Sequence, residues 1–261
     1  MKPFSIQNPT LHQFPLVLSI PHSGTHVPAE IRAQMIPRVL LPNADWFLPE
    51  LYAFLPEQGV TTITAHLSRY AIDLNRSPAQ TRTGDFRSLV YETSTQGRPL
   101  YPQPLSDEEI KRRTESYYLP YHQALQQLLQ DKLTVFPKVY LLDLHSFFLN
   151  FNEQDHGDIL LSDWDHKTAS PQTMHILHRA LEAQGFSVTE NSIKGGYLTR
   201  HFGTLFGERV ESIQIELRYT AYLADRYFGE EEITEKDEAL FASAQQKLKQ
   251  AFSSILEQLS R

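Results

Sequence analysis

The sequence predicts an α/β fold of three layers, in which helices cover both faces of a central sheet. Predicted strands and helices alternate along the 261 residues, which is typical of this architecture. Short apolar runs of strand length lie at residues 16–20 and 138–144, and their near-continuous apolar character indicates burial on both faces. A third strand is predicted at 212–217. Because no repeat, low-complexity tract or linker interrupts the pattern, we predict a single domain over residues 1–261.

Prolines and capping residues set the bounds of the other predicted elements. Four prolines between residues 21 and 42 exclude a long helix there. Asp45 stands where a helix N-cap is expected, and Ser106 with Glu109 forms a capping box. Segment 66–104 lacks periodicity and is rich in Arg with interspersed Tyr, which indicates a binding loop. In chain order we predict a polar lead-in at 1–15, a short helix at 29–35, a helix from 45, a strand at 60–65, a long helix at 106–133 bent at Pro120, a polar loop at 147–157, a strand at 158–162, a helix at 171–184, a strand at 186–190, a polar loop at 194–203 and a final helix at 235–259.

Charge and composition exclude several classes of partner. The net charge of -7 disfavours nucleic acid and anionic membranes. The absence of Cys excludes disulfides, a thiol nucleophile and thiolate metal ligands. The first residues lack the apolar segment of a signal peptide, and no run approaches the roughly 20 apolar residues of a membrane span. We therefore expect a cytoplasmic enzyme that acts on a small molecule.

Two histidines stand where predicted buried strands end. His22 follows the strand at 16–20, and His145 follows the strand at 138–144. Ligands of open α/β sheets bind just outside the carboxyl ends of such strands. A catalytic zinc commonly takes three protein ligands and a water, and Asp45 is our candidate for the third ligand. The alternatives are structural histidines and an Asp45 that serves only as an N-cap.

Two further carboxylates lie on predicted strands. Asp143 precedes His145 by two residues and so faces the same side; it could orient either histidine or be a fourth ligand. Glu216 alternates with Ile213 and Ile215, which places it on the other face of its strand. A carboxylate there could be the general base of a metal-assisted hydrolysis, or only an ion-pair partner of Arg218.

A set of arginines predicts recognition of carboxylates. Arg69, Asn75 and Arg76 flank a buried-looking Ile-Asp-Leu, and guanidinium groups bind carboxylates through a two-pronged fork. Arg200 and His201 follow a Gly-Gly turn and could add an anion contact, with Tyr197 covering the substrate. The alternative is a solvated basic loop.

Taken in order, these segments resemble the N-formylglutamate amidohydrolase family over about residues 16–225. The matching segments are Ile20-Pro21-His22-Ser23-Gly24, Asp45-Trp46, Ser68-Arg69-Tyr70, Asp73-Leu74-Asn75-Arg76, Leu142-Asp143-Leu144-His145-Ser146, Lys194-Gly195-Gly196-Tyr197-Leu198-Thr199-Arg200-His201 and Gln214-Ile215-Glu216-Leu217. The resemblance implies a zinc-carboxypeptidase-like α/β/α domain with a central mixed sheet, shared with aspartoacylases and some peptidoglycan amidases.

The resemblance also implies roles for single residues. It makes His22 and His145 ligands of Zn²⁺ or another divalent metal, Glu216 the catalytic carboxylate, and Asn75 with Arg76 a substrate-binding pair. The family's acidic ligand is often a Glu soon after the first His, but position 25 is Thr, so Asp45 is our substitute. Asp143 and His201 are expected to support the ligands from behind.

The reaction that the resemblance implies is hydrolysis of N-formylglutamate to formate and glutamate. Two alternatives stay open. One is an amidohydrolase for another N-acyl amino acid or a peptidoglycan-type peptide. The other is a non-catalytic protein that binds a dicarboxylate.

Overall fold

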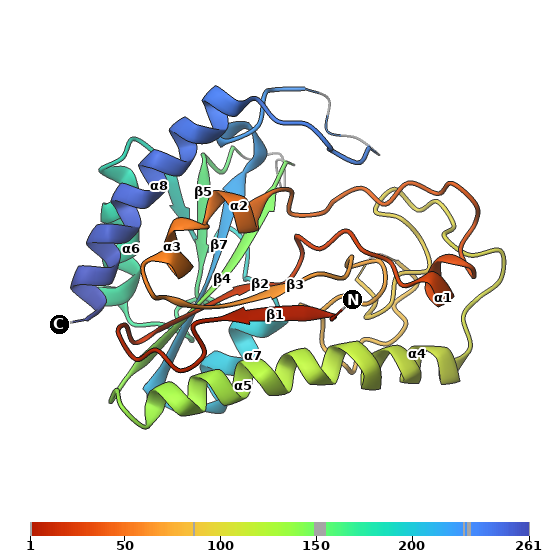
Figure 1. Cartoon of the computed structure of the whole chain (residues 1–261), viewed down its shortest axis with the longest axis horizontal. Helices are drawn as coiled ribbons and strands as arrows, with labels where there is room; N and C mark the ends of the chain where they lie inside the picture. The colour runs from red at the N-terminus through yellow and green to blue at the C-terminus, as the bar shows by residue number, and fades with distance from the viewer. Residues whose placement is uncertain (1, 86, 149–154, 227, 229–230, 261) are drawn as a thin grey trace.

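The computed structural model describes residues 2–85, 87–148, 155–226, 228 and 231–260. Within these residues the chain forms one seven-stranded sheet in the order β1-β3-β2-β4-β7-β5-β6 (Figure 1). β1 is antiparallel to β3 and β5 is antiparallel to β7, while the other neighbours are parallel, so the predicted mixed sheet is confirmed. The strands are β1 (Phe4–Gln7), β2 (Leu16–Ile20), β3 (Thr61–Ala65), β4 (Val139–Phe147), β5 (Ile159–Ser162), β6 (Val188–Glu190) and β7 (Val210–Arg218).

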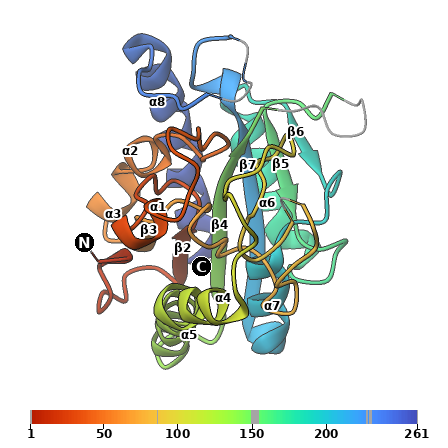
Figure 2. The same cartoon turned by 90° about the vertical axis from the view of Figure 1, so that its right-hand side faces the viewer.

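Helices pack on both faces of this sheet, which confirms the three layers (Figures 1 and 2). One hydrophobic core joins the sheet to α2, α3, α6 and α8, and a second joins it to α1, α4, α5, α7 and part of segment 66–104. The helices are α1 (Ala29–Arg32), α2 (Leu48–Leu51), α3 (Phe54–Glu57), α4 (Asp107–Arg113), α5 (Leu119–Leu133), α6 (Pro171–Glu182), α7 (Tyr197–Leu205) and α8 (Glu238–Leu259). A π-helical turn, Thr114–Tyr118, joins α4 to α5, and short 3₁₀ turns lie at Gly207–Arg209 and Tyr219–Ala221. None of the helices described is both long and apolar enough to span a membrane.

The predicted N-cap at Ser106 is confirmed. The Ser106 hydroxyl accepts a hydrogen bond from the Glu109 backbone N–H at 3.2 Å and begins α4 as predicted. Segment 66–104 is irregular as predicted, without a helix or strand among its described residues. Residues 149–154 of the predicted loop at 147–157 lie outside the described residues.

Four predictions of local structure are wrong. The lead-in at 1–15 contains the edge strand β1. Its alternation of exposed and half-buried residues spans only four residues, which is too short to indicate a strand. β4 continues two residues past His145, because its ladder with β7 runs to Phe147. Asp45 is not an N-cap: α2 begins after Phe47, without a side-chain cap. The predicted loop at 194–203 is helical from Tyr197 onward.

The helix α7 forms there because a distant residue supplies its cap. The side-chain oxygen of Asn75 accepts a hydrogen bond from the Leu198 N–H at 2.8 Å. This satisfies one of the free donors at the start of a helix, a role that the local sequence Gly195-Gly196 cannot fill with a side chain. A Cβ at Gly196 would come within 2.2 Å of Asn75 Nδ2, so the glycine is what lets Asn75 approach.

Candidate functional site

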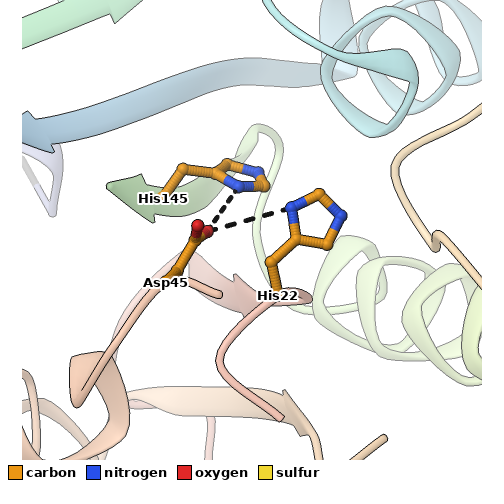
Figure 3. Close-up of side chains that lie close together, drawn as sticks. All are labelled: His22, Asp45 and His145. Atoms are coloured by element: carbon orange, nitrogen blue, oxygen red, sulfur yellow. Dashed lines mark hydrogen bonds and ion pairs between the residues drawn. The ribbon is translucent and has the colours of Figure 1, made fainter. Parts of the chain in front are cut away.

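His22, Asp45 and His145 converge at the carboxyl ends of the central strands. His22 follows β2 and its backbone C=O accepts from the Asp45 N–H at 3.1 Å, which ties the loop before α2 to the end of the strand. His145 lies on the neighbouring strand β4. Figure 3 shows both imidazoles turned toward the Asp45 carboxylate. Asp45 Oδ2 lies 2.9 Å from His145 Nδ1 and 3.8 Å from His22 Nδ1. All three side chains are buried.

A second carboxylate holds each imidazole from behind. His22 Nε2 donates to Asp73 Oδ1 at 2.7 Å, and His145 Nε2 donates to Asp143 Oδ2 at 2.8 Å. With its proton on Nε2, a neutral imidazole at either position has its Nδ1 lone pair on the side of Asp45, where it can bind a metal. This carboxylate–histidine arrangement is typical of metal ligands, because it fixes the tautomer and the ring orientation. Asp143 thus contacts the His145 ring on the nitrogen that does not face Asp45.

The three ligand atoms have the chemistry and spacing of a metal site. They lie within 4.8 Å of one another. A tetrahedral zinc with bonds of about 2.0–2.1 Å would set its ligand atoms about 3.3 Å apart, which falls between the two distances from Asp45. Two nitrogens and one oxygen also leave a fourth position for water or substrate. The residues present thus fit a divalent metal.

The two imidazoles differ in their response to pH. Burial opposes protonation of both. At His145 the charges and hydrogen bonds of Asp143 and Asp45 outweigh burial and raise its pKa well above the ordinary value of 6.5. At His22 burial, reinforced by the charge of Arg69, outweighs Asp73 and lowers the pKa.

Glu216 stands directly beside His145 in the sheet. The two residues are paired in the register of β4 and β7, and both line one cavity of about 600 Å³. Burial, reinforced by the charge of Asp45 and opposed by His145 and Arg69, raises the pKa of Glu216 to about 7. Gln214 Nε2 donates to Glu216 Oε1 at 2.7 Å. Arg218, its alternative partner, pairs with Asp155 at 2.7 Å and donates to the Gly157 carbonyl.

The cavity is lined by both polar and aromatic side chains. His22, Asp45, His145 and Glu216 are its titratable lining residues outside the arginines and lysine, and Phe147, Phe148 and Phe228 are its aromatic ones. Its other lining residues are Asn43, Arg69, Asn75, Arg76, Thr95, Gln96, Ser146, Ile193, Lys194, Gly195, Gly196 and Gln214. Thr95 and Gln96 come from segment 66–104, which therefore walls the cavity.

The predicted carboxylate-binding residues fall into different environments. Arg69 is 8% exposed, and its guanidinium donates to Asp73 Oδ2 at 2.9 Å and to Tyr91 Oη at 3.0 Å. The contacts of the Arg76 guanidinium are longer than those of Arg69. Its Nε lies 3.8 Å from Asp73 Oδ2, and its Nη2 donates to Tyr91 Oη at 3.4 Å. Asn75 Nδ2 donates to Asp143 Oδ2 at 3.3 Å, so Asn75 braces the carboxylate behind His145 as well as capping α7.

Arg200 and Tyr197 line a second hollow of about 370 Å³. It shares Asn75, Arg76, Gly195 and Gly196 with the main cavity, so the two adjoin. The Arg200 guanidinium lies over the Trp164 ring, 4.9 Å from its centroid. His201 instead stacks on the Tyr197 ring at 5.0 Å and lines neither hollow, so the structure does not bring it to the imidazole cluster.

Asp73 is the site residue that the sequence analysis did not single out. It is fully buried and contacts His22, Arg69 and the N–H of Asn75. Its signal was a carboxylate between Ile72 and Leu74, two apolar residues that are themselves buried.

Comparison with known proteins agrees with this architecture. The sequence model of the family "N-formylglutamate amidohydrolase" matches residues 14–223. A protein named N-formylglutamate deformylase from Pseudomonas putida is 31% identical over 232 residues, which cover 83% of this chain and 85% of the relative. A protein of the same name from Pseudomonas aeruginosa is 32% identical over 225 residues, with coverage of 81% and 83%. The crystal structure of an N-formylglutamate amidohydrolase from Ralstonia eutropha JMP134 matches with a TM-score of 0.83 and 27% identity, over 99% of this chain and 97% of that one. The chain belongs to the N-formylglutamate amidohydrolase family.

Proposed function

We propose that this protein is a zinc-dependent amidohydrolase of one catalytic domain that converts N-formylglutamate and water to formate and glutamate. The observation that carries the proposal is the convergence of His22, Asp45 and His145 with Glu216 in one cavity. The names of the relatives supply the substrate. A protein that only binds dicarboxylates would not need a buried cluster of this kind.

The residues of the cavity divide the chemistry among them. A bound zinc ion would polarise the acyl carbonyl and lower the pKa of water from about 16 toward about 7. Glu216 takes a proton from the attacking water and passes it to the leaving amine nitrogen as the C–N bond breaks. A pKa of about 7 suits a group that must both accept and release a proton near neutral pH. Arg69 lines the same cavity and supplies positive charge for the oxyanion that develops on the acyl oxygen.

The glutamate end of the substrate binds in the second hollow. Arg76 borders both hollows, and Arg200 presents a second guanidinium beside the Tyr197 ring, 5.7 Å from its centroid. Two arginines lining one hollow match the two carboxylates of the substrate. Tyr197 and Trp164 add flat apolar faces that fix the position of Arg200.

Metal content and activity test the proposal together. The purified protein should contain about one zinc per chain and should hydrolyse N-formylglutamate faster than N-acetyl- or N-succinylglutamate. His145→Ala should lose both metal and activity, since it removes one of three ligands. His175→Ala is the matched control, because His175 is exposed on α6 and should keep both. Full zinc occupancy in His145→Ala, or no hydrolysis of any N-acyl amino acid by the zinc-loaded wild type, would contradict the proposal.

A further inference from the structure

The segment from Ala71 to Arg76 carries three groups of the site but has no regular structure of its own. It supplies Asp73 behind His22, Asn75 behind His145, and Arg76 at the junction of the two hollows. These residues form neither helix nor strand. Their backbone carbonyls therefore need partners from elsewhere, because a buried carbonyl left unpaired is costly.

Side chains of the long helical arm, α4 to α5, supply those partners. Arg113 Nη1 donates to the Ala71 carbonyl at 3.2 Å, His122 Nε2 to the Leu74 carbonyl at 2.9 Å, and Tyr118 Oη to the Arg76 carbonyl at 2.9 Å. All three donors are buried. Burial lowers the pKa of His122 to about 4, so its ring is neutral at pH 7.

The stacking of the rings fixes two of these donors against each other. The Tyr118 and His122 rings stack with centroids 4.0 Å apart, and the Phe202 ring of α7 lies 5.9 Å from His122. The carbonyls at residues 74 and 76 are thus held by a rigid pair of rings.

The spacing of the three donors requires the π turn. Arg113 and Tyr118 are five residues apart, and in a regular α-helix they would point about 140° away from each other. In the turn Thr114–Tyr118 the Leu119 N–H bonds to the Thr114 carbonyl, five residues back instead of four. This accommodates one extra residue and returns Tyr118 to the face of Arg113. Pro120 has no N–H to offer the Ser116 carbonyl, which favours opening the helix at this point.

We propose that the π turn aligns Arg113, Tyr118 and His122 as a clamp on the carbonyls of residues 71, 74 and 76, and that Tyr118 is a positioning residue for Arg76. The role of Arg76 in binding substrate rests on the proposed function. Because Arg76 binds the glutamate end away from the reacting bond, its displacement weakens ground state and transition state alike. Loss of the Tyr118 hydroxyl therefore acts on KM and leaves kcat nearly unchanged.

The adjacent tyrosine provides a matched control. Tyr117 donates to Glu30 Oε1 at 2.8 Å on the exposed side of the same turn. Tyr118→Phe and Tyr117→Phe each remove one hydroxyl, but only the first removes a contact with the segment. Each hydroxyl also has a second partner, Tyr197 for Tyr118 and Arg112 for Tyr117.

The test compares the KM of both variants for N-formylglutamate with that of the wild-type protein loaded with zinc. Tyr118→Phe should raise KM about tenfold, the worth of one hydrogen bond, with kcat within about twofold. Tyr117→Phe should keep the wild-type KM. A general loss of structure would lower the active fraction, and hence kcat, without moving KM. An unchanged KM in Tyr118→Phe, or an equal rise in both variants, overturns the clamp.

Hydrogen exchange separates a failed clamp from a failed function. If the zinc-loaded wild type does not hydrolyse N-formylglutamate, the proposed function fails and a KM for this substrate cannot be measured. Amide exchange in a peptide covering residues 70–77 then decides. Faster exchange in Tyr118→Phe but not in Tyr117→Phe supports the clamp, and equal exchange in both variants overturns it.

Discussion

Glu216 is the residue on which the distinction between an enzyme and a binding protein depends. As general base it must reach the attacking water but need not touch the metal. Glu216→Gln keeps the size of the side chain and an oxygen that can accept from Gln214, but it cannot take a proton. We expect kcat to fall by about 10²–10⁴, the usual contribution of general-base catalysis, with zinc content retained.

A glutamate on the same strand controls for the loss of charge. Glu211 lies on β7 and pairs with Lys138 at 2.6 Å, at the opposite end of the strand from the cavity. Glu211→Gln should change the melting temperature more than kcat. Loss of zinc in Glu216→Gln would make Glu216 a ligand, and an unchanged kcat would remove it from the mechanism.

At the scale of single residues, position near the carboxyl end of a predicted strand indicated which polar side chains line the cavity. His22, His145 and Glu216 could be singled out because polar groups interrupt apolar strands, and the structure brings all three to one cavity. Asp73 could not be singled out, because its role depends on a contact with His22, 51 residues away. Asn75 was predicted to bind substrate, whereas its contacts with Asp143 and α7 come from elements whose packing no local pattern reveals.

At the scale of elements, α4 anchors the wall of the cavity through a buried ion pair. Arg113 is fully buried, and its Nε donates to Glu109 Oε1 at 2.8 Å, while its Nη1 donates to the Ala71 carbonyl and to the Tyr101 hydroxyl. Hydrogen bonds from Arg112 and Arg113, against a smaller effect of burial, lower the pKa of Glu109 from 4.5 to about 2. The stability that Glu109 contributes is therefore complete above pH 4.5 and is lost as the pH falls toward 2.

Urea unfolding of Glu109→Gln checks this pair. At pH 7 the variant should be less stable by about 1–3 kcal/mol, since a charged hydrogen-bond partner of a buried guanidinium is lost. The difference from wild type should shrink as the pH is lowered from 4.5 to 3. Glu115→Gln is the control, because Glu115 is exposed and lies 3.9 Å from Lys111. A difference that stays constant between pH 7 and pH 3 would contradict the pKa shift.

Elements determined by local interactions could be predicted from the sequence, and elements determined by distant contacts could not. β2, β3 and β4 and the capped helices α4, α6 and α8 were predictable, because burial of apolar runs and local caps determine them. β1 is determined by pairing with β3, and α7 by the Asn75 side chain, both distant in sequence. Pro120 predicted a bend in the long helix. The π turn next to it, with its hydrogen bond between residues five apart, is visible only in the structure.

At the scale of the whole molecule, protons and a metal ion compete for the same atoms of the buried site. Raised pKa values at His145 and Glu216 mean that the folded metal-free protein holds protons there more tightly than the unfolded chain. The stability from Glu216 is complete below pH 4.5 and lost as the pH rises through about 7. That from His145 is complete below pH 6.5 and lost as the pH rises through its higher folded pKa. His22 acts in the opposite sense, because its pKa is lowered.

Zinc binding should therefore stabilise the protein more at pH 8 than at pH 6. Nδ1 of both histidines must be unprotonated to bind zinc, so protons compete with the metal more strongly at the lower pH. Free zinc at 100 times its Kd would add about 2.7 kcal/mol to the free energy of unfolding, which corresponds to a rise in Tm of about 5–10 °C. Calorimetric melting with zinc and with EDTA at both pH values measures the difference, and His145→Ala should abolish it. A zinc-dependent rise in Tm that is equal at both pH values, or larger at pH 6, would mean that zinc does not displace protons from this cluster.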